Sequence, residues 1–442
     1  MTKREKGTGR WIEIGKDILI ILLTCSAVWM LLGSNLTRLS LNHLMGRENK
    51  TVTAQQQQSV SWAEAVRPLR IAATMSQWEQ RVRYGAQYDQ NAVDDLFQQT
   101  ASLLVEALSN VEALQKVPHW RWMQAMERSP GLYFDFQGEL PLSVLMGWLS
   151  GNQSVEEATV RRILLTVEQE NVVLYYYDLD TKTYYRGVCE VSTPAQLESV
   201  VSVLNGNGAF YAFESEAYTS LAPETLLSED IRYQPVFNAS NPLANGRSDL
   251  KILMEDLGFY LAGCSFYSAD DEVARSGGET VRLDSNGRVE YHNGGESEGH
   301  FLLNIPAEPE KEKFAVVEGC RRLAAQVIDP RCGEGKLYLK YVEKTEQGWE
   351  VSFDYSLNAS PVWLKSGCAA EFAVKDGAIE SFVIQFRNYQ LSGHEDIVIP
   401  LPQAVAAVQA LGLEGQELLL VYRDMGEELL NAQWATIRTE EE

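Results

Sequence analysis

The chain opens with a polar, basic stretch that is followed by an apolar run without any charge over residues 18–33. A helix needs about 20 mostly apolar residues, with about 17 as a practical minimum, to cross a bilayer. Segment 17–36 is therefore predicted to be a transmembrane anchor. Because Lys and Arg gather in segment 1–16, this segment is predicted to be cytoplasmic and the bulk of the chain extracytoplasmic.

Two other interpretations of the apolar run stay open. A cleaved signal peptide ends in a small-x-small site, and Gly33-Ser34-Asn35 is a poor one. A lipoprotein would be acylated at Cys25, but Thr24 before it is bulky and the apolar run continues well past it. We expect the anchor to be retained.

A polar tether is predicted over 37–64, and an α+β domain over 65–217. The clearest helix signal is at 93–111, where apolar residues such as Leu96, Leu104 and Leu108 recur at helical spacing. Further strands are expected at 68–73, 132–136, 159–167, 171–177, 183–189 and 209–213, and further helices at 120–128, 141–149 and from Pro194 to near Gly206.

A central domain is predicted over 218–300. It begins with a loop rich in Pro and Asn over 218–247, and a helix follows at 250–257 and ends at Gly258. The strongest hairpin signal of the chain lies at 280–291, where alternating apolar residues flank Asn286-Gly287. This dipeptide favours a primed two-residue turn with positive φ.

The last domain is predicted over 301–442. Its expected elements are a strand at 301–305, a helix at 313–327, strands at 336–342, 348–356, 370–374 and 379–390, a helix at 402–411 and two closing strands. Helices that alternate with meanders indicate helices packed on one face of a sheet. The fold class is therefore α+β: one N-terminal transmembrane helix, then a multidomain region of mixed sheets with packed helices.

Charge and composition limit the kinds of partner that this chain is expected to bind. The 442-residue chain is 45% hydrophobic and 10% aromatic, which is normal for folded protein. Residues 51–442 hold 30 Lys and Arg against 57 Asp and Glu, a net charge of −27. Nucleic acid requires clustered basic surface, so no nucleic-acid partner is expected. Docking of the external part on anionic lipid is disfavoured for the same reason.

The cysteines outside the anchor are odd in number and widely spaced, and none forms a Cys-x-x-Cys pair: Cys189, Cys264, Cys320, Cys332 and Cys368. Zinc frameworks are therefore not expected. We expect free cysteines, and a bridge between Cys320 and Cys332 is the alternative.

No catalytic constellation is found. The sequence lacks a Gly-x-Ser-x-Gly elbow, a phosphate-binding loop and a metalloprotease helix. The best polar cluster, His394-Glu395-Asp396, is expected to be a solvated turn. Asp178-x-Asp180 lacks the Gly and Glu that an EF-hand loop requires. We therefore predict no catalytic residue, no metal, no cofactor and no enzymatic activity.

Two features are candidates for binding. The aromatic runs at 175–177 and 184–185 are suited to bind glycan or peptide, although such strand residues more often form cross-strand pairs. Within the anchor, Ser26, Trp29 and Gly33 share one helix face, and small and polar residues let helices approach in lipid. These three residues are the candidate partner contacts, with a plain anchor as the equal alternative.

With these segments laid out, the chain resembles the YycH family over nearly its whole length. The marks are diffuse: Leu22-Leu23-Thr24-Cys25-Ser26-Ala27, Tyr133-Phe134-Asp135-Phe136 before Leu140-Pro141-Leu142, Pro223-Glu224-Thr225-Leu226-Leu227 before Asn241-Pro242-Leu243, and Leu257-Gly258-Phe259 leading to the 283–291 hairpin. The closing helix and meander repeat, with Trp434 near its end, resembles the YycI domain.

The resemblance implies a membrane-anchored accessory regulator of the WalK sensor histidine kinase in Gram-positive bacteria, with the kinase and a YycI-like sister protein as partners. It transfers no catalytic residue. The regulatory sign differs between organisms in this family, so neither activation nor repression is predicted.

The leading hypothesis is thus a non-enzymatic, single-pass membrane regulator of a two-component kinase that controls the cell wall or envelope. The alternative is an extracytoplasmic binding or scaffold protein for cell-wall polymer or peptide, which would use the aromatic strands. A protease-inhibitor-like module is a third, weaker hypothesis.

Overall fold

A computed structural model describes residues 65–438 of the chain, apart from residues 79, 154, 156 and 296–298. Within these residues it contains seven α-helices and four β-sheets, which agrees with the predicted α+β class. The predicted cytoplasmic segment, anchor and tether lie outside the described residues. In the part that is described, no helix is long and apolar enough to cross a membrane.

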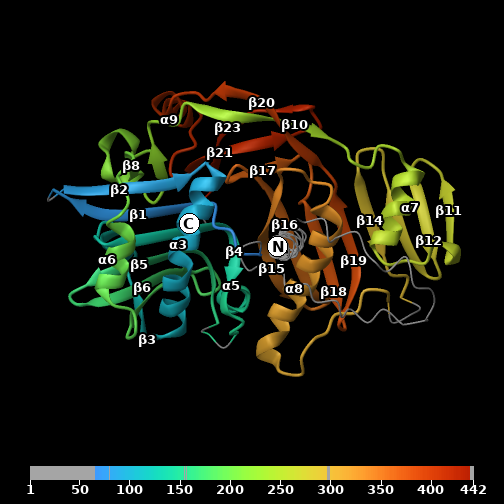
Figure 1. Cartoon of the computed structure of the whole chain (residues 1–442), viewed down its shortest axis with the longest axis horizontal. Helices are drawn as coiled ribbons and strands as arrows, with labels where there is room; N and C mark the ends of the chain where they lie inside the picture. Colours follow the sequence, from blue (N-terminus) through green and yellow to red (C-terminus); the bar gives the residue numbers. More distant parts are fainter. Residues whose placement is uncertain (1–64, 79, 154, 156, 296–298, 439–442) are drawn as a thin grey trace, which may run out of the picture. The chain divides into compact units, whose positions relative to one another are not determined.

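The first sheet has seven antiparallel strands in the order β2-β1-β4-β5-β6-β7-β3 (Figure 1). The strands are β1 (Arg70–Gln77), β2 (Gln80–Gln87), β3 (Val111–Val117), β4 (Gly131–Pro141), β5 (Thr159–Glu168), β6 (Asn171–Asp178) and β7 (Thr183–Cys189). Neighbouring residues of β4 pack on opposite faces, Phe134 in the main core and Tyr133 in a second core. Both faces of the sheet are therefore buried, which explains its nearly continuous apolar strands.

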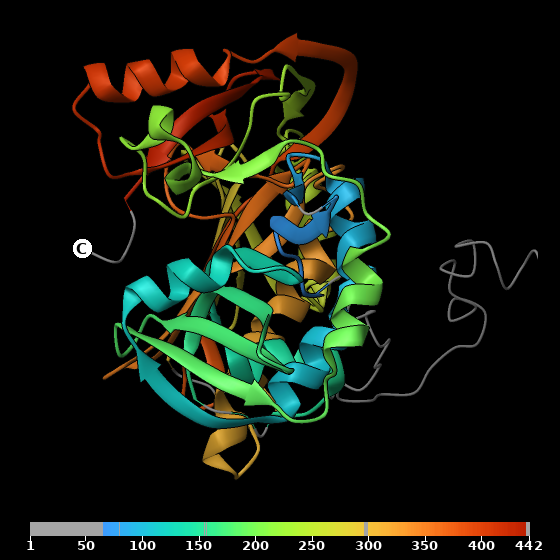
Figure 2. The same ribbon diagram turned by 90° about the vertical axis from the view of Figure 1, so that its left-hand side faces the viewer.

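Helices cover both faces of this sheet (Figure 2). On the main-core face lie α3 (Gln90–Ser109), α5 (Leu142–Ser150) and α6 (Pro194–Val201), and on the other face lies α4 (His119–Met126). The predicted stripe of α3 is buried, including Leu96, Leu104 and Leu108. The helix begins where the Asp89 side chain accepts hydrogen bonds from two backbone N–H groups of the first turn.

The second large sheet has eleven strands, in the order β11-β12-β13-β14-β19-β18-β16-β17-β21-β23 with β15 beside β16. They are β11 (Cys264–Ser268), β12 (Glu272–Ser276), β13 (Glu279–Leu283), β14 (Arg288–His292), β15 (Lys336–Thr345), β16 (Gly348–Leu357), β17 (Ser360–Leu364), β18 (Ala370–Lys375), β19 (Ala378–Gln385), β21 (Glu417–Asp424) and β23 (Ala432–Ile437). Two helices pack on it, α7 (Arg247–Asp256) near β12 and α8 (Pro309–Ile328) over β16 and β18 (Figure 1).

Two small sheets complete the described fold. One joins β10 (Tyr233–Ser240) to β20 (Asn388–Ile397) and β22 (Leu429–Leu430), and the other pairs β8 (Ala209–Tyr211) with β9 (Leu226–Ser228). The remaining helix, α9 (Leu401–Ala410), packs its buried face, including Val405, against Leu227 of β9 and Leu418 of β21. Segments far apart in the sequence therefore share these small cores.

Close contacts tie the seven-stranded sheet to the C-terminal elements. Gly138, in a bulge of β4, lies so near β15 that an added Cβ would be 1.9 Å from the Leu339 carbonyl oxygen. Gly147 of α5 packs on the Phe314 ring of α8, where an added Cβ would be 2.4 Å from ring carbons. At Gly138 the neighbouring atom is backbone, so a side chain would push the two strands apart, whereas at Gly147 the Phe314 ring would have to shift.

Several predicted elements are corrected by the structure. The segment 218–247, predicted as a loop, contains β9 and β10, because β10 gains partners in the distant strands β20 and β22. The predicted strand 301–305 has only an isolated bridge, between Leu302 and Ala378. The predicted strand 379–390 is divided into β19 and β20. The strands that were not predicted include β2, β3, β11, β12 and β17.

The hairpin of β13 and β14 is confirmed, but its turn differs from the predicted one. Its three-residue loop ends at Gly287, which has a φ of +89°, and Asn286 has no positive φ. The Asp284 carboxylate accepts hydrogen bonds from the backbone N–H groups of Asn286 and Arg288. This side-chain cap favours a three-residue loop that requires glycine at one position only.

Candidate functional site

Among the described residues, a cluster of buried charges lies where the seven-stranded sheet meets β21. Arg70 lies on β1, Asp135 on β4, Arg161 and Arg162 on β5, and Glu417 at the start of β21. Their side chains are only 1–12% exposed. We call these five residues the ion network. Charged residues are almost never this buried unless they are paired, and here they are.

Both carboxylates of the ion network bridge several arginines. The Arg70 Nη2 atom lies 2.6 Å from Asp135 Oδ2 and 2.7 Å from Glu417 Oε1. The Arg161 side chain lies 3.0 Å from Asp135 Oδ1 and 2.8 Å from Glu417 Oε2. The Arg162 Nη2 atom lies 2.7 Å from the same Glu417 oxygen. These charge-assisted hydrogen bonds hold the start of β21 against three strands of the first sheet.

Glu224 extends the ion network to the surface. One of its oxygens lies 2.6 Å from Arg162 Nη1, and the other accepts a hydrogen bond from the Tyr184 hydroxyl at 3.3 Å and lies 3.1 Å from His119 Nε2. The His119 ring stacks on Tyr184, with ring centroids 5.1 Å apart. With Glu224 included, three arginines face three carboxylates, so the buried charge is balanced.

The arginines control the ionisation of the two central carboxylates. Burial alone would raise the pKa of Glu417, but the positive charges of the three arginines lower this pKa to about 2. The same balance lowers the pKa of Asp135 below its ordinary value. Both groups therefore stay ionised at neutral pH, and a permanently charged carboxylate among arginines positions structure rather than exchanging protons.

This arrangement predicts a loss of stability in acid. Because the pKa of Glu417 is lowered on folding, the ion network contributes fully above the ordinary carboxylate pKa of about 4.5, and its contribution is lost as the pH falls toward about 2. We expect the urea midpoint of the purified protein to fall steadily over this range. A Glu417→Gln variant should show a shallower dependence, and equal slopes would contradict the assignment.

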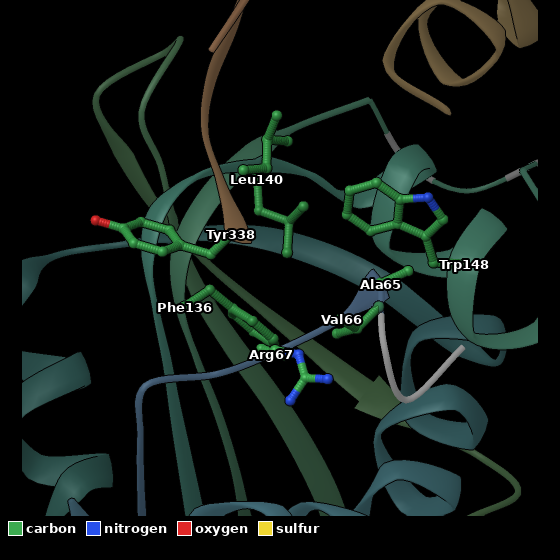
Figure 3. A pocket seen from close by; sticks show the side chains of 8 residues that line it. Ala65, Val66, Arg67, Phe136, Leu140, Trp148 and Tyr338 are labelled. Carbon is green, nitrogen blue, oxygen red and sulfur yellow. The ribbon is translucent and has the colours of Figure 1, made fainter. Parts of the chain in front are cut away.

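A small hollow lies beside the contact between β4 and β15 (Figure 3). It is lined by Phe136 and Leu140 of β4, Trp148 of α5 and Tyr338 of β15, among others. Its volume is about 10 Å³, which is room for about one water molecule. Among the described residues, no group of three or more His, Cys, Asp and Glu side chains is placed to hold a metal ion.

The aromatic runs form cross-strand pairs, which was the favoured interpretation, and three of their five rings are buried. Tyr175 and Tyr176 are 0% and 1% exposed, and Tyr184 is 8% exposed. Tyr175 donates a hydrogen bond to Glu168. The three buried rings offer no face to a sugar or peptide. Tyr177 and Tyr185 are half-buried, and each packs on a ring of the neighbouring strand, Tyr177 on Tyr184 and Tyr185 on Tyr176. Cross-strand pairing therefore accounts for these residues.

The other polar candidates have structural positions. His394 is exposed, as predicted, but lies in β20 rather than in a turn. Asp178 is buried and accepts hydrogen bonds from the Thr159 backbone N–H and the Thr181 hydroxyl. The five cysteines of the described residues are free, which confirms that expectation. The candidate contacts Ser26, Trp29 and Gly33 lie outside the described residues.

The ion network was not predicted, although the sequence contains a signal for it. Arg161 and Arg162 interrupt an otherwise apolar strand, and Asp135 stands between Phe134 and Phe136. Charges inside a buried strand indicate partners elsewhere. The pairing with Glu417 could not be predicted, because only the tertiary fold brings β21 to this position.

The fold and these sites define a class: a multi-sheet α+β protein whose buried charges join its sheets. No family model matches the sequence, and no curated protein matches it. Among solved structures, YycH from Bacillus subtilis matches with a TM-score of 0.52 at 13% identity, over 86% of this chain and 95% of that one. The chain therefore has a YycH-like fold, which confirms the resemblance at the level of the fold.

Proposed function

We propose that this protein is a non-enzymatic regulator of a two-component sensor histidine kinase that controls cell-wall or envelope homeostasis. The observation that carries the proposal is the YycH-like fold, which extends over 86% of this chain and 95% of YycH. A match of this length includes both large sheets rather than one common motif. The proposed partners are a WalK-like kinase and a YycI-like sister protein.

The proposed mechanism is contact rather than chemistry. Segment 17–36 anchors the chain with segment 1–16 in the cytoplasm, and the folded part lies outside the membrane. A regulator changes kinase output only if it binds the active and inactive states of the kinase with different affinity. Within the described residues, the ion network joins the two large sheets, which are the parts that we propose the kinase or the sister protein contacts. A YycI-like character for 301–442 and the domain boundaries stay predictions.

We expect a scrambled sequence over 18–33 to change kinase output by about fivefold or more, which is a usual size for coupling between sites. The measurement is a reporter of kinase-dependent transcription in cells that carry the scrambled or the native chain at equal levels. The scramble keeps composition, and therefore insertion, unchanged. Unaltered output would remove the anchor from the mechanism.

Contact through one helix face is tested by photocrosslinking in cells. Photoreactive residues at Ser26, Trp29 and Gly33 should capture the kinase or the sister protein, because this face permits close approach. Thr24 and Leu31, on the opposite face of a helix, are the matched control positions. Capture of lipid alone from all five positions would reduce the anchor to a tether.

A further inference from the structure

The exposed side of α9 carries no charge, and neither does the chain directly before and after this helix. Residues 397–413 include no Asp, Glu, Lys or Arg, although the whole chain is 22% charged. Exposed helix sides normally carry charges, as Asp94 of α3 and Lys251 of α7 do here. The outward side of α9 consists instead of exposed, mostly small residues at helical spacing: Gln403, Ala406, Ala407 and Ala410.

Large apolar side chains stand at both ends of this helix. Ile397 at the end of β20 is 68% exposed, Ile399 is 59% exposed, and Leu411 just after α9 is 71% exposed. Trp434 of β23 connects the two ends, because its ring packs on the core beneath α9 and its Nε1 donates a hydrogen bond to the Ile399 carbonyl at 2.7 Å. Figures 1 and 2 both show α9 and β20 on the same side of the folded part. We call the exposed residues of 397–413 the α9 surface.

Carboxylates flank the α9 surface in the chain. Glu395 and Asp396 of β20 precede it and Glu414 follows it, and all three residues are exposed. In the part of the chain that the structure describes, no Lys, Arg or His nitrogen lies within 4.0 Å of these three carboxylates. The border of the α9 surface is therefore acidic and has no internal counterion.

The exposed cation beside Ile397 in the β10 and β20 ladder belongs to the other face of that sheet. Tyr233 lies opposite Ile397, and Arg232 directly precedes Tyr233. Successive residues of a strand point to opposite faces. Arg232 therefore shares the face of the buried Val398, whose backbone N–H donates a hydrogen bond to the Arg232 carbonyl.

The single sign of its border distinguishes the α9 surface from another group of exposed apolar residues, Ile252, Tyr260 and Tyr267. That group is bordered by both signs, with Lys251 on α7 and Asp271 between β11 and β12. A mixed border does not select the charge of a partner, whereas an acidic border selects a basic one.

We propose that the α9 surface is a docking site for a helix of another protein that has an apolar side with Lys or Arg beside it. Small outward residues let two helix axes approach to about 8 Å, and the partner's cations face the carboxylates at the ends. α9 packs on Leu418 of β21, next to Glu417 of the ion network. A docked helix therefore rests on the strand that the ion network holds.

Other occupants fit less well. In a second copy of this chain the α9 surface has the same acidic ends, so carboxylates would face carboxylates whether the two helices run parallel or antiparallel. Helices that lie on membranes are rich in Lys and Arg, which 397–413 lacks. The docking site rests on the proposed function only in that its partner is taken to be a regulatory one.

The test is photocrosslinking in cells that express the full chain, with photoreactive residues at Gln403 and Ala410 and, as the matched control, at the exposed Gln98 of α3. We expect capture from the first two positions only. The captured segment, identified by mass spectrometry, should have apolar residues at helical spacing with Lys or Arg beside them.

Ala410→Lys should lower capture from position 403 about tenfold or more, because it places a charge and a long side chain in the contact. Lysine has nearly the helix propensity of alanine, so the urea midpoint should not change. Ala195→Lys, at an exposed position of α6, is the matched control and should leave capture unchanged. Glu414→Lys should also weaken capture, and replacing the facing Lys or Arg of the captured segment by Glu should restore it.

Capture of a second copy, of lipid alone, of a segment without Lys or Arg, or of nothing would each overturn the docking site, as would full capture by Ala410→Lys. Kinase output is measured in the same cells. Normal capture by a chain that does not affect the kinase would refute the proposed function alone. An absence of capture by a chain that does affect the kinase would refute the docking site alone.

Discussion

Replacement of Asp135 by asparagine is expected to lower the free energy of unfolding by about 3–5 kcal/mol, because it leaves buried arginine charge without its partner. Asparagine keeps the shape of the side chain, so the loss reports charge rather than a cavity. Arg70 and Arg161 each lie within 3.0 Å of the Asp135 carboxylate and are themselves almost fully buried. Urea denaturation followed by tryptophan fluorescence measures the effect.

Two matched variants make this result specific. Asp376→Asn, in an exposed turn before β19, should change stability by less than about 0.5 kcal/mol. The double variant Asp135→Asn with Arg161→Met removes one charge of each sign and should recover part of the loss, since the cost lies mainly in the unpaired charge. A double variant that is simply the sum of the two single losses would contradict coupling through the ion network.

Elements with strong local signals were predicted well. The stripe of α3 is determined by residues three and four positions apart, so it is present in the sequence itself. The helix α6 begins where predicted because Thr193 and Gln196 form a capping box, with Pro194 at the first position. Gly258, at a φ of +86°, ends α7 for an equally local reason.

Elements whose stability depends on distant partners were missed. Pro235 and the surrounding polar residues disfavour a strand locally, and β10 exists because β20 and β22 pair with it. The segment at 301–305 has strand propensity, but in the fold only Leu302 makes a bridge. The ion network follows the same rule: its arginines were visible in β5, while its carboxylate in β21 was not recognisable as their partner.

The directions of the bonds in the ion network explain why these balanced charges are buried. Replacing such a network by apolar residues often leaves stability equal or higher, so stability alone does not explain it. Its bonds have defined directions, whereas apolar contact between sheets permits sliding. The ion network therefore fixes one register of β21 against β1, β4 and β5, and a protein that acts by contact benefits from a defined surface.

The second large effect is expected at the contact between β4 and β15. Gly138→Ala should lower the free energy of unfolding by about 3 kcal/mol, because the new Cβ would lie 1.9 Å from the Leu339 carbonyl oxygen. The neighbouring atom is backbone, so it cannot rotate away and the two strands must separate. Urea denaturation and hydrogen exchange of the β15 amides measure the loss of stability and the separation.

Gly263→Ala is the matched control, because an added Cβ there meets no atom within 4 Å and its φ is ordinary. It should change stability by less than about 0.5 kcal/mol. Faster exchange in β15 for Gly138→Ala alone would place the damage at this contact. If both variants unfolded at the same urea concentration, β4 and β15 would be able to separate freely, and the contact could not be what joins the first sheet to the C-terminal strands.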